Sequence, residues 1–384
     1  MLYHLFMYLA AGEHYVHENP LFRAVCAALF CFALILIAAP KAIRQLIRYK
    51  LGDRPEFDHA SLNELTRDKS RIPTMGGLLI LVAIAAGTLL FADPLNFYVQ
   101  MGFLCLLWLG AVGAVDDWFK LTASRRSGTR DGLKSYEKLL FQIGLGVLLG
   151  LFTFSFGRDN FAVIGSTFGP AGSVTQIEPY RVLSVPFYKT GLMLGSFAFM
   201  TISVLVITGT SNAVNLTDGM DGLASGCVAI CSLVFMVIAY LVGSEPAAGK
   251  LLLPHIPLSG ELAVLCGSIL GATVGFLWYN CHPARVFMGD TGSLPLGGMI
   301  GYVAIVTRQE LMLLIAGGVF VIEAISVILQ VGYFKATGGK RIFLVAPIHH
   351  HFHVSGWTEP QTVVRFWILA AVFAALALLT MKLR

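Results

Sequence analysis

Charged residues are scarce in this chain, and their scarcity argues against most soluble folds. Asp, Glu, Lys and Arg make up 13% of the 384 residues, hydrophobic residues make up 56%, and the mean hydropathy is +0.75. Soluble globular domains usually contain about 25% charged residues. With 40 glycines and 27 phenylalanines as well, the composition is typical of a protein that crosses a membrane many times.

The seven cysteines lack the spacing of a disulfide framework or of a thiolate metal site. No C-x-x-C pair occurs, and all but Cys281 lie within apolar stretches, where a small side chain packs well. Residues 1–20 have no basic segment ahead of an apolar core, so we expect no cleaved signal peptide. No linker, low-complexity stretch or evident repeat divides the chain, and we expect residues 1–384 to form one helical membrane domain.

Apolar stretches of membrane-spanning length recur along the chain. About 20 apolar residues cross the hydrocarbon core of a bilayer. Ten stretches of about this size occur, near residues 21–40, 74–92, 97–115, 138–156, 190–209, 222–243, 260–278, 293–307, 311–334 and 363–381. The expected fold class is therefore an all-α polytopic membrane protein with about ten transmembrane helices.

Basic residues are divided unevenly between the loops. The loops after the odd-numbered spans contain 19 of the 27 lysines and arginines. Because Lys and Arg are enriched in cytoplasmic loops, we expect these loops in the cytoplasm and both termini on the outer side. In the outer loop 157–189, alternating runs at 161–165 and 180–185 are compatible with a short hairpin.

The acidic pair Asp116-Asp117 follows the apolar part of the third span. Such groups are costly near lipid, and every acidic and histidine cluster of this chain falls on the expected cytoplasmic side. Adjacent carboxylates on a helix point in different directions, so one can ligate a divalent cation or take a proton while the other holds a neighbour. The alternative is a solvated helix end, which the helix dipole disfavours for acids.

Residues 212–223 contain two amides and two carboxylates, from Asn212, Asn215, Asp218 and Asp221. If the segment is helical, Asp218 and Asp221 share a face. Its glycines let the backbone approach a phosphate closely. A plain reversal with an Asx-turn needs one Asn or Asp rather than four, so a functional interpretation is favoured.

Residues 280–298 form the sharpest local signature, with Asp290 between glycines. Thr291 and Ser293 are expected to donate to phosphate, and Phe287 is expected to stack on a base. Hard oxygen ligands around a diphosphate suit Mg²⁺, which takes only one or two protein carboxylates. A structural turn is the alternative.

The histidine run 349–351, with His353 close by, follows a basic cytoplasmic segment. Successive residues do not all face one ion, and no Cys or Glu lies nearby at ligand spacing, so phosphate binding by imidazolium and hydrogen bonds is favoured over zinc. A surface run without a role is the alternative. Lys69 and Lys138 lie nearest the span ends and are assigned to phosphate.

Glu323 is a lone acid in the middle of the ninth span. A proton or ion path there would indicate a transporter. A single such residue is more typical of a protonated or hydrogen-bonded acid that joins helices.

Together these groups are suited to phosphoryl transfer, with a metal on a diphosphate, cations around the leaving group and an acid that activates the acceptor. The membrane setting indicates that one substrate is a lipid phosphate. The other substrate is then a nucleotide-activated donor from the cytoplasm.

Five segments resemble the phospho-N-acetylmuramoyl-pentapeptide transferases, a branch of the polyprenyl-phosphate N-acetylhexosamine 1-phosphate transferases. They are Thr74-Met-Gly-Gly, Val115-Asp-Asp, residues 212–223, Val286-Phe-Met-Gly-Asp-Thr-Gly-Ser-Leu, and Ala346-Pro-Ile-His-His-His followed by Gly356-Trp and Val363-Val-Arg-Phe-Trp. The segments occur in the family order. The last one resembles the muramoyl-pentapeptide branch rather than the simple N-acetylglucosamine branch. One departure is Arg71-Ile72, where the family pattern has Gly-Thr.

The resemblance implies transfer of phospho-N-acetylmuramoyl-pentapeptide from UDP to undecaprenyl phosphate in the bacterial inner membrane, with Mg²⁺. UMP is released, and the first lipid intermediate of peptidoglycan synthesis is formed. A related transferase that uses UDP-N-acetylglucosamine and an anion transporter are the alternatives. No nucleic-acid partner is expected, and a homodimer is compatible with the sequence.

The resemblance also implies roles for individual residues. Asp290 ligates Mg²⁺, and Asp116 and Asp117 lie at the reacting phosphates, with Asp116 as base or nucleophile. The implied substrate-binding residues are Asn212, Asn215 and Asp218 at the diphosphate; Lys69, Asp221 and Phe287 at the uridine; Lys138 at the phosphates; His349 and His350 at the donor's phosphates or sugar; and Asn280. Both a phosphoryl-enzyme route and direct attack by the lipid phosphate are open.

Overall fold

The computed structural model describes residues 18–48, 69, 72–126, 132–160, 166–168, 174–176, 178–188 and 191–382. Its elements, in chain order, are α2 (Pro20–Arg48), α4 (Gly77–Phe91), α5 (Phe97–Arg126), α6 (Ser135–Asn160), β1 (Ser166–Phe168), β2 (Val174–Gln176), η3 (Pro179–Arg181), β3 (Val182–Leu183), β4 (Leu192–Met193), α7 (Ser196–Thr217), α8 (Leu223–Gly243), α9 (Glu245–Lys250), α10 (Glu261–Asn280), α11 (Asp290–Val306), α12 (Glu310–Ala316), α13 (Gly318–Ala336), α14 (Ile348–Val354) and α15 (Glu359–Lys382). The predictions for residues 1–17, Arg71 and residues 161–165 fall outside the described part.

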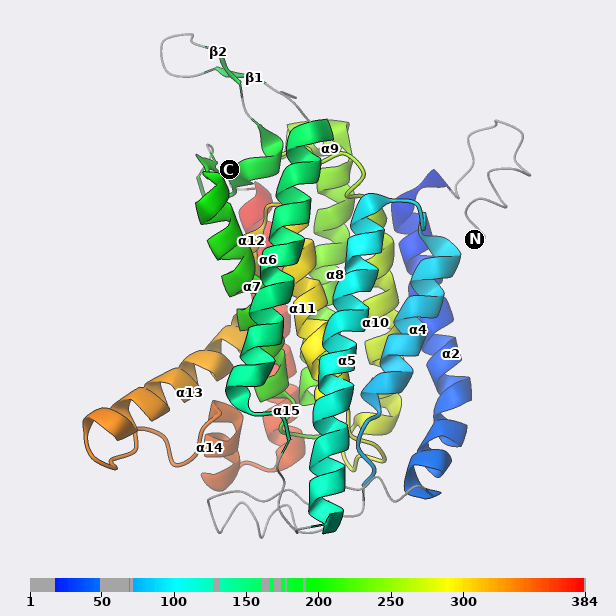
Figure 1. Cartoon of the computed structure of the whole chain (residues 1–384), viewed down its shortest axis with the longest axis vertical. Helices are drawn as coiled ribbons and strands as arrows, with labels where there is room; N and C mark the ends of the chain where they lie inside the picture. Colours follow the sequence, from blue (N-terminus) through cyan, green and yellow to red (C-terminus); the bar gives the residue numbers. More distant parts are fainter. Residues whose placement is uncertain are drawn as a thin grey trace.

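Within the described part, eight helices are long and apolar enough to cross a membrane, namely α2, α5, α6, α7, α8, α10, α13 and α15. The prediction of a helical polytopic membrane protein is confirmed at this level. The shorter helices α4 and α11 lie where two further spans were expected. The ninth expected span is instead divided at Gly317 into α12 and α13, and α13 leaves the bundle at an angle (Figure 1).

The segment between α6 and α7 contains two small antiparallel pairs, of which β1 and β2 are labelled at the upper end of Figure 1. Strand β1 pairs with β2, and β3 pairs with β4, with Val182 opposite Met193. Of the two runs expected to form a hairpin, residues 161–165 lie outside the described part, and Val182–Leu183 pairs with Leu192–Met193, the residues that follow it. Alternation predicts a strand but not which strand lies beside it. This pairing also delays the start of α7 to Ser196.

Helix α11 forms the centre of the bundle (Figure 1), and all of its residues are buried. It contacts α5, α7, α8 and α4. A helix that is apolar on every side is stable only when other helices surround it. Because Asp290 is the first residue of α11, this packing holds Asp290 in place at one end of the bundle.

Helix α10 packs closely on α2 through small residues four positions apart. A Cβ atom at Gly267 would lie 2.2 Å from the carbonyl oxygen of Ala24, and one at Gly271 would lie 1.9 Å from that of Ala28. Glycines at this spacing let two helix backbones approach closely, as is common in membrane helix pairs.

Candidate active site

Asp116 and Asp117 meet Asp290 in one buried cluster. Each carboxylate offers an oxygen within 4.8 Å of the other two, and the three residues are 0%, 4% and 8% exposed. The pair does not end its helix as expected, because α5 continues to Arg126. The apolar run ends near the pair, but no Gly or Pro follows until Gly128, so the helix has no reason to stop there. The expectation that the acidic pair stands at the end of a helix, where the helix dipole disfavours acids, is therefore wrong.

Gly113 brings α5 against the start of α11. A Cβ atom at Gly113 would lie 2.1 Å from the carbonyl oxygen of Asp290. One turn further along the same face, the Asp117 carboxylate accepts hydrogen bonds from the backbone N–H of Asp290 at 3.1 Å and of Thr291 at 2.9 Å. An acid is favourable at a helix N-terminus, where it satisfies free N–H groups.

The Thr291 hydroxyl also donates to Asp117, at 2.6 Å. We expected this hydroxyl to donate to phosphate, and the structure corrects that expectation. Asp117 thus takes three hydrogen bonds from the start of α11, which leaves Asp116 and Asp290 as the carboxylates that face the lysines.

Two lysines bridge Asp116 and Asp290. The Lys120 ammonium lies 2.7 Å from Asp116 Oδ2 and 3.2 Å from Asp290 Oδ1. The Lys138 ammonium lies 3.3 Å and 3.1 Å from Oδ2 of Asp116 and of Asp290. The backbone N–H of Leu133 donates to Asp116 Oδ1 at 2.7 Å. Lys120 was not predicted, although its i, i+4 spacing from Asp116 was a usable signal.

This cluster fits a divalent cation that is shared with a diphosphate. The cluster contains three carboxylates and two ammonium groups, so negative charge remains in excess if all are ionised. Mg²⁺ takes one or two protein carboxylates and completes its shell with water and phosphate oxygens.

The segment between α7 and α8 turns instead of continuing as a helix. Helix α7 ends at Thr217, and Gly222 adopts the left-handed conformation with φ 81° before α8 begins. The expected shared helical face of Asp218 and Asp221 is therefore wrong. The two carboxylates face different clusters.

Asp218 lies on the side of the acidic cluster. Desolvation by the surrounding protein, with the nearby carboxylates of Asp290 and Asp117, raises the pKa of Asp218 well above its ordinary value, although a hydrogen bond from the Gly289 N–H opposes this. The side chain keeps partial solvent exposure. Asp218 thus binds a proton more readily than an ordinary carboxylate and can donate to a phosphate oxygen when protonated.

Asp221 belongs to a second cluster, with Lys69. The Lys69 ammonium lies 2.5 Å from Asp221 Oδ1, and Nδ1 of His282 lies 3.1 Å from Asp221 Oδ2. The backbone N–H of Ala284 donates to the same Oδ2 at 3.1 Å. The centre of the Phe287 ring lies 5.9 Å from the Lys69 nitrogen. The structure thus brings together the three residues that the resemblance assigns to uridine.

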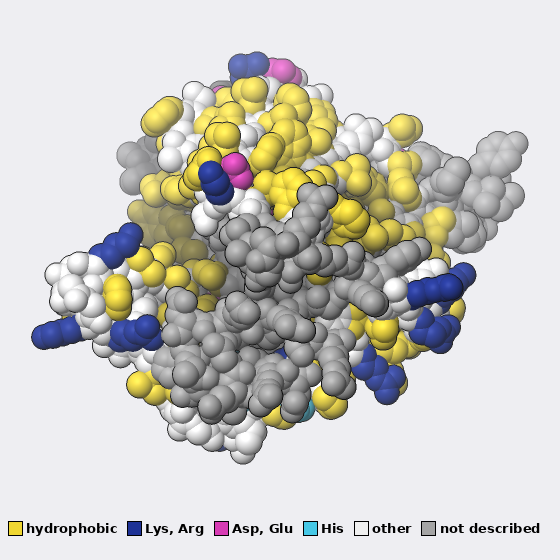
Figure 2. All heavy atoms as spheres, turned by 60° about the horizontal axis from the view of Figure 1, so that its bottom comes forward, with side chains coloured by type: hydrophobic (Ala, Val, Ile, Leu, Met, Phe, Trp, Pro, Cys, Tyr) yellow, Lys and Arg dark blue, Asp and Glu magenta, His cyan; other side chains and the backbone are white. Residues whose placement is uncertain are grey.

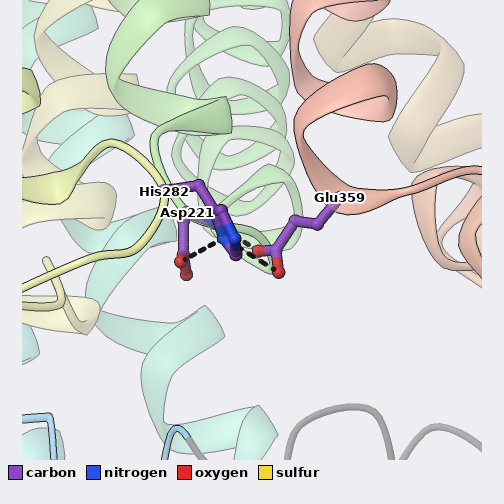
Figure 3. A group of neighbouring side chains, drawn as sticks. All are labelled: Asp221, His282 and Glu359. Atoms are coloured by element: carbon purple, nitrogen blue, oxygen red, sulfur yellow. Dashed lines mark hydrogen bonds and ion pairs between the residues drawn. The ribbon is translucent and has the colours of Figure 1, made fainter.

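Glu359 and His282 complete this second cluster and were not predicted. In Figure 3 the side chains of Asp221, His282 and Glu359 converge from the turn before α8, the loop after α10 and the start of α15. His282 lies in the same motif as Asp290, which was a weak signal. Glu359 had no local signal, since its partners are far away in the sequence.

The predicted donor-binding histidines lie in α14. His349 Nδ1 is 2.9 Å from Glu323 Oε2, and both side chains are fully buried. Glu323 is therefore a hydrogen-bonded acid that joins two helices, which confirms the second interpretation of this residue. A Cβ atom at Gly219 would lie 2.4 Å from His349 Nε2, so the α7–α8 turn packs directly on this ring.

Burial lowers the pKa of His350 to about 2, with smaller effects from neighbouring histidines and Lys69. The proposed imidazolium is therefore wrong for this residue. A neutral His350 can take part only in hydrogen bonds and not in ion pairs.

The asparagines of α7 are engaged with other helices. The Asn212 amide donates to Gln142 of α6 at 2.7 Å, and Asn215 accepts from the Ser293 hydroxyl of α11 at 2.8 Å. The expectation that Ser293 donates to phosphate is corrected accordingly. These amides join α7 to α6 and α11.

Comparison with known proteins agrees with this site. The model of glycosyl transferase family 4 matches residues 99–308. Relatives named phospho-N-acetylmuramoyl-pentapeptide-transferase are 42% identical in Desulfotalea psychrophila, over 100% of both chains, and 43% identical in Thermodesulfovibrio yellowstonii, over 94% of each. A third, from Desulforapulum autotrophicum, is 40% identical over 94% of each chain. The chain belongs to this transferase family.

Family membership and the eight apolar helices together make this transferase a multi-pass membrane protein. The matched residues 99–308 include Asp116, Asp117 and Asp290, whereas Lys69, Glu359, His349 and His350 lie outside them. The second cluster thus combines Asp221 and His282, from within the matched segment, with Lys69 and Glu359 from outside it.

Two motifs of the transferase pair with each other like strands. The backbone N–H of Phe287 donates to Pro73 O at 2.8 Å, and those of Gly76 and Gly77 donate to Phe287 O at 2.8 Å and Met288 O at 2.9 Å. These bonds place Phe287 between the two clusters. Asn280 supports the same loop, because its amide donates to Val286 O at 2.9 Å and its Oδ1 accepts from the Gly222 N–H at 3.1 Å.

Proposed function

We propose that this transferase moves phospho-N-acetylmuramoyl-pentapeptide from UDP to undecaprenyl phosphate in the inner membrane. UMP leaves, and the first lipid intermediate of peptidoglycan forms. The observation that carries the proposal is the buried cluster of three carboxylates and two lysines. It occurs in a chain that is at least 40% identical, over nearly its whole length, to transferases of this name.

Asp290 would hold Mg²⁺, with Asp116 beside it, because the carboxylates of both face Lys120 and Lys138 while Asp117 is fixed to α11. When bound, Mg²⁺ supplies charge neutralisation on the diphosphate and polarises the transferred phosphoryl group. Lys120 and Lys138 are placed to exchange their carboxylate partners for phosphate oxygens and to stabilise the leaving UMP.

Asp116 supplies the acid–base or covalent chemistry of the reaction. Its carboxylate either attacks the donor, so that a phosphoryl-enzyme forms, or takes the proton of the lipid phosphate, which then attacks directly. Labelled UMP enters the UDP donor in the absence of lipid only on the covalent route. An exchange assay with wild-type protein therefore separates the two.

The second cluster is suited to the uridine. The Phe287 ring offers a stacking surface, and the Asp221 carboxylate is an acceptor for the N–H of the base. Asp218, Asn212, Asn215 and Asn280 support the diphosphate between the clusters, and His349 and His350 lie on the side of the sugar. The amides of Asn212, Asn215 and Asn280 already have protein partners, so we assign these three residues to holding the shape of the site.

We further propose that α4 and α11 complete ten spans of a single membrane domain and that the site faces the cytoplasm. Figure 2 shows the end of the bundle that is lowest in Figure 1, and Lys and Arg side chains lie at its left and right margins. Exposed examples are Lys41, Arg44 and Arg48 at the end of α2, Lys335 in the last turn of α13, and Lys340 and Arg341 after it. Helix α2 begins and α15 ends at the opposite end of the bundle (Figure 1), which agrees with termini on the outer side.

Purified protein is expected to release UMP from UDP-N-acetylmuramoyl-pentapeptide when undecaprenyl phosphate and Mg²⁺ are present. Removal of Mg²⁺ with a chelator is expected to stop the release. The measurement is the amount of UMP and of lipid-linked product formed. The same assay with UDP-N-acetylglucosamine as the donor provides the comparison. Release from UDP-N-acetylglucosamine but not from the muramoyl donor contradicts the proposal.

A further inference from the structure

We propose that Glu359 is a positioning residue for the nucleotide end of the site, an inference that rests on the function proposed above. Glu359 is the first residue of α15 and is 8% exposed. Its position puts a second carboxylate beside Asp221 and Lys69.

The contacts of Glu359 hold both partners of the Lys69–Asp221 pair. Its Oε1 lies 2.5 Å from the Lys69 ammonium and accepts the backbone N–H of Asp221 at 2.9 Å. Its Oε2 lies 3.6 Å from Nδ1 of His282. One carboxylate therefore fixes the backbone of Asp221 and the side chain that neutralises it.

The negative charge of Glu359 affects how strongly Lys69 pairs with Asp221. Lys69 shares its ammonium between two carboxylates at equal distances, so it is not committed to Asp221 alone. Without the charge of Glu359, Lys69 pairs more fully with Asp221, and that carboxylate becomes a weaker acceptor for the base. Hydrogen bonds to charged groups are stronger than neutral ones, so their loss is measurable.

Glu359→Gln keeps the shape of the side chain and an oxygen for the Asp221 N–H but removes the charge. We expect the Kd for UMP and the KM for the UDP-linked donor to rise about tenfold, the size of one charge-assisted hydrogen bond. The KM for lipid phosphate and kcat are expected to change little, because the reacting carboxylates belong to the other cluster. UMP binding is measured by calorimetry, which needs no turnover.

Glu245→Gln is the matched control. Glu245 is also the first residue of a helix and also precedes a proline, but it is exposed and lies away from the site, in α9. It has the same favourable position at a helix N-terminus. An equal effect of both substitutions would show that the helix end, rather than the cluster, is responsible and would overturn the proposal.

A double-mutant cycle with Lys69→Met separates positioning from general stability. If Glu359 acts through Lys69, the UMP Kd of the double variant is close to that of Lys69→Met alone. If Glu359 acts on α15 alone, the free-energy effects of the two substitutions are additive, and the proposal is overturned. Unchanged UMP affinity in Glu359→Gln also overturns it. Wild-type protein that neither binds UMP nor uses the UDP-linked donor instead overturns the proposed function.

Discussion

Asp290→Asn is expected to lower kcat by about 10²–10³-fold, the size typical of losing one electrostatic contact to a transition state. The amide has nearly the same shape, so α11 still begins at residue 290, and the backbone N–H there still donates to Asp117. What is lost is the charge opposite Lys120 and Lys138. Mg²⁺ then has one acid fewer to bind, and the two ammonium groups are held by Asp116 alone.

The measurement is kcat over a range of Mg²⁺ concentrations, with a melting curve for each protein. Asp159→Asn is the control, because Asp159 is exposed and its ion pair is with the neighbouring Arg158. We expect the Mg²⁺ concentration for half-maximal rate to rise in Asp290→Asn and to stay unchanged in the control. Activity within a few-fold of wild type at every Mg²⁺ concentration contradicts the metal assignment.

Gly113→Ala is expected to lower activity by about 100-fold although residue 113 carries no chemistry. Alanine favours helix over glycine by about 1 kcal/mol, so α5 itself is stabilised. The added Cβ, however, would lie 2.1 Å from the carbonyl oxygen of Asp290, where backbone has to move. Displacement of reacting groups by about 1 Å can cost about 100-fold in rate.

Gly144→Ala in α6 is the matched control, because a Cβ atom there meets nothing within 4 Å. Helix content from circular dichroism and the melting temperature show whether each variant is folded. A folded Gly113→Ala protein with normal kcat would mean that the approach of α5 to α11 does not control the site.

The chain's apolar runs predicted most of the helices, because the length of a span is fixed by the bilayer. They did not predict the ends of the helices. The α5 helix continues beyond Asp117 because the bilayer sets the length of the apolar run and does not end the helical backbone. The α7 helix instead ends at Thr217, and the turn that follows reaches α8 through Gly222 in the left-handed conformation. Both corrections depend on local backbone preferences.

The acidic residues of the site were predictable because each is costly near lipid. Their partners were predictable only in part. Lys120 is one helical turn from Asp116, and local spacing was enough to find it. Glu359 is 290 residues from Lys69, and Glu323 is 26 residues from His349 in a different helix, so only the packing of the bundle brings these partners together.

The turn between α7 and α8 has a consequence for the choice of donor. Asp218 lies near Asp290 and Asp117, whereas Asp221 pairs with Lys69. Three residues span at most about 10 Å, so the turn limits how far apart the two clusters can hold these carboxylates. On the proposed function, a lengthened turn would separate the group at the diphosphate from the group at the base and would weaken binding of a donor whose nucleoside and sugar are joined by two phosphates.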